Sequence, residues 1–97
     1  MSDNEKRPEW LTENADGSLT IELAGKGMTV SGAPVTSVTM REPTVDDELT
    51  VQEMSASGAQ KELHLFANLC EVAPDDVRSL SMRNYRRLQR GYSGFMD

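Results

Sequence analysis

The period of the hydrophobic pattern changes at Pro43, and this change constrains the fold more than any other feature of the sequence. Before Pro43, Leu19, Ile21 and Leu23 alternate with polar residues, which is typical of a strand with one buried face. After it, apolar residues recur at helical spacing. Because proline cannot donate to a sheet ladder, the sheet should end there. The sequence therefore predicts an α+β fold.

The expected sheet has three antiparallel strands near the N-terminus. Alternating residues predict strands over about 18–24, 27–31 and 35–41. Between them, Gly25-Lys26-Gly27 and Ser31-Gly32-Ala33-Pro34 have the composition of turns. Short strands joined by tight turns favour a meander with one apolar face.

Three helices and one short helical segment should follow the sheet. Their expected ranges are about 45–54, 59–71, 74–80 for the short one, and 82–95. The second range has the strongest pattern, and we expect it to be the central core helix. Its apolar face consists of Ala59, Leu63, Phe66, Ala67 and Cys70.

The junction between the sheet and the first helix carries capping signals. Thr44 followed by Asp47 fits a capping box, in which each residue satisfies a backbone amide of the other. Acidic residues fill the first turn, where the helix dipole favours negative charge. We interpret Arg41, Glu42 and Pro43 as fixing the angle between the sheet and this helix, so the junction is predicted to be structural.

Residues 1–17 are polar, charged and without periodicity, which predicts a disordered acidic tail. Residues 18–97 should then form a single small α+β domain. The acidic start is not typical of a signal peptide, and no apolar run approaches the roughly 20 residues of a membrane span. With one cysteine, Cys70, no intrachain disulfide can form. These features indicate a cytosolic protein with no membrane partner.

No catalytic or metal-binding constellation is apparent in the sequence. The single histidine, His64, has no serine or cysteine at a motif spacing, and Cys70 lies on the apolar face of its predicted helix. The carboxylate clusters at 46–48 and 75–76 are explained by helix N-terminal charge. We therefore expect a non-enzymatic protein that uses no cofactor and no metal.

The last predicted helix has two contrasting faces. An apolar, mainly aromatic face consists of Tyr85, Leu88, Tyr92 and Phe95, and a basic face consists of Arg83, Arg86, Arg87 and Arg90. Four guanidinium groups can contact nucleic-acid phosphates, an acidic partner or this chain's own acidic first half. The net charge of −6 opposes nucleic acid, because an acidic body repels phosphate. We therefore expect nucleic acid not to be the partner.

Four motifs follow one another along most of the chain. They are Val38-Thr39-Met40-Arg41-Glu42-Pro43-Thr44 with Asp47 and Leu49, then Leu63, Leu65, Phe66 and Leu69, then Pro74, Val77 and Leu80, and finally Tyr85, Leu88, Gly94 and Phe95. In this order, from about Leu19 to Phe95, the chain resembles the E-type tail assembly chaperones of Mu-like tailed phages. The acidic tail has no clear counterpart in that pattern.

The resemblance implies a role without chemistry. Such chaperones bind the tape-measure protein, a very long helical chain, and keep it soluble until the tail tube protein polymerises around it. A long apolar helix exposed in the cytosol would otherwise aggregate. The implied partner is the tape-measure protein, the major tail tube protein is a second candidate, and the implied location is the host cytoplasm.

The resemblance also implies a binding surface. On this basis we expect the face of Tyr85, Leu88, Tyr92 and Phe95 to be partly exposed and to accept a helix as a groove. Leu88→Asp is then predicted to abolish tape-measure binding. The alternative is a small nucleic-acid-binding regulator that uses the basic face of the same helix, with binding that depends on salt.

Overall fold

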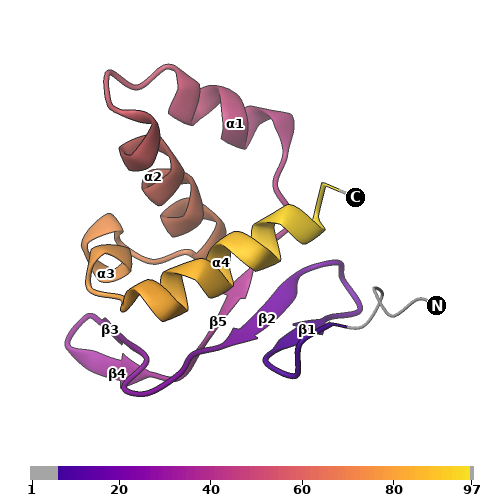
Figure 1. Cartoon of the computed structure of the whole chain (residues 1–97). Helices are drawn as coiled ribbons and strands as arrows, with labels where there is room; N and C mark the ends of the chain where they lie inside the picture. Colours follow the sequence, from indigo (N-terminus) through magenta and orange to yellow (C-terminus); the bar gives the residue numbers. More distant parts are fainter. Residues whose placement is uncertain (1–6, 97) are drawn as a thin grey trace.

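Three antiparallel strands form the main sheet of the computed structural model, which describes residues 7–96 (Figure 1). Strand β2 (Leu19–Glu22) lies in the centre, between β1 (Leu11–Glu13) and β5 (Ser37–Met40). Ile21 stands opposite Leu11 on one side and opposite Val38 on the other. All three side chains are buried, so they form one apolar face. The predicted α+β class with a three-stranded antiparallel sheet is confirmed.

The order of the strands differs from the expected meander. Strand β3 (Met28–Val30) pairs with β4 (Ala33–Val35) in a separate two-stranded sheet, and neither belongs to the main sheet. The cause lies at Ser31 and Gly32, whose φ angles of 51° and 82° form a two-residue hairpin turn. The turn predicted over 31–34 is therefore shorter, and the strand predicted over 35–41 is divided between β4 and β5.

Strand β1 lies within the segment that was expected to be disordered. Leu11 is buried against the sheet, and the carbonyl of Trp10 accepts a hydrogen bond from the amide of Glu22. Two apolar residues in a polar segment are therefore enough to add a third strand to the sheet. The predicted disorder is wrong for residues 11–17, and the first part of that prediction, residues 1–6, lies outside the described residues.

In the described part of the chain, four helices follow the sheet: α1 (Val45–Gln52), α2 (Gly58–Cys70), the short α3 (Pro74–Arg78) and α4 (Met82–Gly94). Three of them begin at a hydroxyl residue, Thr44, Ser57 or Ser81, whose side chain accepts a hydrogen bond from the amide three residues later. Helix α2 ends at Glu71, which adopts a left-handed conformation. The capping residues therefore define where the long helices begin.

The core lies between the main sheet and the helices α2 and α4 (Figure 1). Helix α2 packs on β5, and α4 packs on β2. A β-carbon added at Gly91 would lie 2.9 Å from the Cδ1 atom of Ile21, so glycine allows α4 to cross the sheet closely. The fully buried side chains at the centre include Ile21, Met40, Phe66, Leu69 and Leu88.

Candidate functional site

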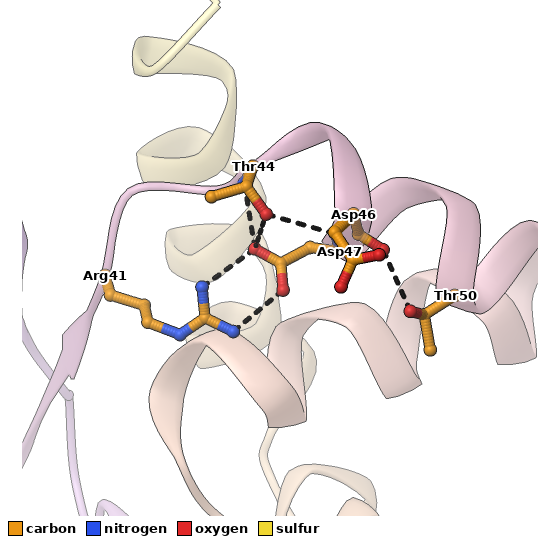
Figure 2. A network of polar contacts seen from close by, with 5 residues as sticks. All are labelled: Arg41, Thr44, Asp46, Asp47 and Thr50. Carbon is orange, nitrogen blue, oxygen red and sulfur yellow. Dashed lines mark hydrogen bonds and ion pairs between the residues drawn. The ribbon is translucent and has the colours of Figure 1, made fainter.

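A bidentate ion pair joins the end of the sheet to the first helix (Figure 2). The two terminal nitrogens of Arg41 donate to the carboxylate of Asp47 over 2.7 and 2.8 Å. The backbone amide of Arg41 donates to the carbonyl of Leu69, near the end of α2. One arginine therefore connects β5, α1 and α2, and the position of these elements depends on it.

The capping box predicted for α1 is present. The hydroxyl of Thr44 accepts from the amide of Asp47 over 3.2 Å, and the carboxylate of Asp47 accepts from the amide of Thr44 over 2.8 Å. The Arg41 guanidinium, and to a lesser extent these bonds to Thr44, hold the pKa of the Asp47 carboxyl well below its usual range. Of the two residues that lie between Arg41 and Thr44 in the sequence, Glu42 is exposed and Pro43 is half-buried. These contacts fix the start of α1 relative to the sheet.

Asp47→Asn is expected to lower the free energy of unfolding at neutral pH by about 1–2 kcal/mol, because the amide loses the charge that Arg41 pairs with. The pKa of Asp47 is depressed in the folded state. Its contribution is therefore present above the unfolded pKa of about 3.9 and is lost as the pH falls through the folded value. In urea unfolding, the difference between the two proteins should shrink below about pH 4. A difference that stays constant with pH would contradict this account.

The aromatic face of α4 closes the core. The rings of Tyr85 and Tyr92 lie 5.6 and 5.4 Å from the ring of Phe66, centroid to centroid. Between them, Leu88 is 0% exposed. Phe95 is half-buried at the end of the same face. The prediction of a binding groove along this face is therefore wrong at Leu88, because a fully buried side chain cannot contact a partner in the folded protein.

The hydroxyls of the two tyrosines are directed to carboxylates. Tyr85 donates to Glu62 over 2.7 Å, and Tyr92 donates to Glu48 over 3.4 Å. Burial, followed by the neighbouring carboxylate, raises the pKa of both tyrosines. These bonds connect α4 to α2 and to α1, so the tyrosines help to hold the helices together.

The four arginines of the basic face of α4 have two different environments. The guanidinium of Arg87 lies 4.8 Å from the centre of the Trp10 ring and donates to the carbonyl of Glu22. The other three arginines, Arg83, Arg86 and Arg90, are exposed, and within residues 7–96 none of the ion pairs includes them. The predicted face of four arginines is thus a face of three, since Arg87 holds the N-terminal segment.

The structure contains an apolar groove between α2, α3 and α4 that was not predicted from the sequence. Its volume is about 210 Å³, and it is lined by Ala59, Leu63, Val77, Arg78, Leu80, Met82 and Tyr85. Most of the Met82 side chain is exposed at its rim. Because three elements contribute the lining, no periodic pattern within one element could have indicated it. Met82 gave the one local signal, as an apolar residue outside the aromatic face of α4.

The structure places the reactive side chains away from one another. Burial raises the pKa of the Cys70 thiol to about 12, which keeps it protonated and unreactive. His64 is half-buried on the same helix, nearly two turns away. Within residues 7–96, no group of three or more His, Cys, Asp or Glu side chains is placed to hold a metal ion. In the same part of the chain, no helix has the length and apolar character to cross a bilayer.

The chain is therefore a small α+β domain with an ion-paired junction between sheet and helix and an apolar groove. The family described as "Phage tail assembly chaperone proteins, E, or 41 or 14" matches residues 20–97, which is most of the chain. The protein therefore belongs to the phage tail assembly chaperone family, and its general role is that of a chaperone in tail assembly. No curated protein and no solved structure matches the chain significantly.

Proposed function

We propose that this protein binds the tape-measure protein in the host cytoplasm and keeps it soluble until the tail tube protein polymerises around it. The proposal includes no catalytic step. Membership of the tail assembly chaperone family over residues 20–97 carries it. A protein that protects an apolar helix needs an apolar surface of its own, and the groove between α2, α3 and α4 is the surface that fits this need best.

The size of the groove favours a protein partner over a small molecule. Small-molecule sites usually have volumes of roughly 300–1,000 Å³, whereas this groove measures about 210 Å³. That space suits one or two apolar side chains that project from a helix. Leu63, Leu80 and Tyr85 supply the apolar walls, and Met82 is a flexible residue that adapts to different side chains.

A small groove also suits reversible binding. Interfaces that bury less than about 1,200 Å² are usually weak and transient. A chaperone that coats a long helix must later leave it, because the tube protein takes its place. Many weak contacts along one chain protect the helix together and still allow each copy to be displaced.

Met82→Asp is expected to reduce capture of the tape-measure protein by at least about tenfold, because it places a charge at the apolar rim of the groove. The substitution should not disturb folding, since Met82 is exposed and an acidic residue is favourable in the first turn of α4. The measurement is a pull-down by tagged protein from cells that express the neighbouring tail genes, with mass spectrometry of the captured chains.

Met96→Asp is the matched control, because Met96 is equally exposed but lies outside the groove. It should capture the tape-measure protein as the wild type does. Unchanged capture by Met82→Asp would contradict the assignment of the groove. Nuclease treatment tests the alternative function, a nucleic-acid-binding regulator. A complex that disappears with nuclease would support nucleic-acid binding by Arg83, Arg86 and Arg90.

A further inference from the structure

A hollow of about 520 Å³ lies between the turn after β2 and the start of α4. Ala24 and Asn84, whose two hydrogen bonds connect these elements, both belong to its lining, so the fold fixes its position. The other lining residues are small or polar, namely Gly25, Lys26, Gly27, Ser79, Ser81 and Arg83. Because small-molecule pockets are mostly apolar, this lining favours a strongly polar group as the ligand.

The charge of the hollow is positive. Lys26 contributes to it from the turn and Arg83 from α4, whereas no aspartate or glutamate is among the described lining residues. Both cations are exposed, and the ion pairs found within residues 7–96 include neither of them. Uncompensated positive charge in a concave site attracts anions from solution. The polar group that fits the hollow is therefore an anion.

Arg83 also begins a row of exposed arginines along α4. Arg86 and Arg90 follow it three and seven positions later and therefore lie on the same side of the helix. At a rise of about 1.5 Å per residue, the row spans about 10 Å. Arg87 does not belong to the row, because its guanidinium lies over the ring of Trp10. The hollow and the row together form one basic surface, which consists of Lys26, Arg83, Arg86 and Arg90. A ligand that contacts all of this surface carries several negative charges.

The surroundings of the basic surface do not suit a nucleic acid. Single strands are usually held by bases that stack on exposed aromatic rings. In this protein Tyr85 and Tyr92 pack on Phe66, and the ring of Trp10 has Arg87 over it. Binding to a duplex through its backbone often involves about 6–10 phosphate contacts, which is more than four cations can make. The net charge of −6 adds repulsion at longer range. An acidic protein segment needs neither stacking nor so many contacts.

We propose that the basic surface binds an acidic segment of another protein, with one aspartate or glutamate side chain in the hollow and the next ones along the arginine row. An arginine guanidinium matches a carboxylate with two parallel hydrogen bonds. Arg41 and Asp47 form such a pair within this chain. The groove between α2, α3 and α4 contains none of the four cations of the basic surface. The proposal therefore does not rest on the groove or on the tape-measure protein.

Fluorescence anisotropy with a labelled oligoglutamate peptide and the full chain tests the proposal. The wild type should bind the peptide at low ionic strength. Binding should weaken as the ionic strength rises to about 0.15 M, where charges are screened beyond about 8 Å. Lys26→Gln and Arg83→Gln should each weaken binding by at least about threefold, and the double variant by at least about tenfold. Both residues are exposed, so circular dichroism should show that all three variants remain folded.

Lys61→Gln is the matched control, because it removes the same charge from α2, where Lys61 lines a different hollow together with Glu48 and Gln52. It should bind the peptide as the wild type does. A wild type that does not bind, a double variant that binds unchanged, or an equal loss in Lys61→Gln would each overturn the proposal. A single-stranded oligonucleotide of equal charge is the competing ligand. Tighter binding of this oligonucleotide than of the peptide would assign the surface to nucleic acid instead and overturn the proposal.

Light scattering distinguishes another protein from a second copy of this acidic chain as the partner. The wild type alone and the double variant alone should have the same mass in solution. A lower mass for the double variant would show that the basic surface joins copies of the chain, and it would overturn the choice of another protein as the partner.

Discussion

Leu88→Asp is expected to unfold the protein, and not merely to remove a binding contact. Leu88 is 0% exposed and lies between the rings of Tyr85 and Tyr92, which pack on Phe66. A carboxylate at this position would be buried without a partner, in addition to the loss of apolar contacts. The cost should exceed about 5 kcal/mol. A domain of this size has a total stability near the lower end of about 5–15 kcal/mol, so the folded state should not persist.

Leu49→Asp is the matched control, because it makes the same substitution at a leucine that is mostly exposed. Circular dichroism and urea unfolding should show a cooperative transition for Leu49→Asp and none for Leu88→Asp. Leu88→Ala should remain folded with a loss of about 2–5 kcal/mol. A cooperatively folded Leu88→Asp protein would show that Leu88 is not part of the core. The face of Tyr85, Leu88, Tyr92 and Phe95 would then again be a candidate binding surface.

Local signals in the sequence were sufficient for much of the fold. Each helix of the structure lies within a few residues of its predicted range, because Thr44, Ser57 and Ser81 cap helices through bonds to residues close in sequence. The central strand was also predictable, since Leu19 and Ile21 alternate with polar residues. These features depend on short-range chemistry, which a single sequence contains.

The pairing of strands was not predictable in the same way. The alternating pattern of residues 28–30 indicated a strand but not its partner, which proved to be β4. Likewise, Leu11 has no periodic neighbours, and β1 forms because an apolar side chain finds space beside Ile21. The prediction of disorder failed here because composition describes the average of a segment. One buried leucine and one tryptophan are enough to order this segment against the sheet.

The candidate site shows a similar division. Periodicity placed Tyr85, Leu88 and Tyr92 on one face of α4, which is correct, but it could not indicate whether a partner or α2 covers that face. The groove was missed because its lining comes from α2, α3 and α4 and exists only after they pack. Arg41 and Asp47 were both assigned to the junction from the sequence, because they lie only six positions apart around Pro43. Their ion pair itself was not predicted.

Replacing Asn84 should produce the second large effect on stability. Asn84 is buried, and its amide forms two hydrogen bonds with the backbone of Ala24. Its oxygen accepts from the Ala24 amide over 2.7 Å, and its nitrogen donates to the Ala24 carbonyl over 3.0 Å. This side chain therefore connects α4 to the turn after β2, across 60 residues of sequence. In Asn84→Leu the Ala24 amide would lose its partner, whereas the Ala24 carbonyl would keep the hydrogen bond from the Gly27 amide, so the cost should be about 1–3 kcal/mol.

Leucine is the more severe substitution, because it fills the space of the amide and excludes water. In Asn84→Ala, water can enter from the adjacent hollow of about 520 Å³ and bond to Ala24, so the loss should be smaller. Asn68→Leu makes the same change on an exposed part of α2 and should alter the free energy of unfolding by less than about 0.5 kcal/mol. Urea unfolding of the three variants provides the comparison. Equal losses for Asn84→Leu and Asn68→Leu would mean that this hydrogen-bonded link does not hold α4 to the sheet.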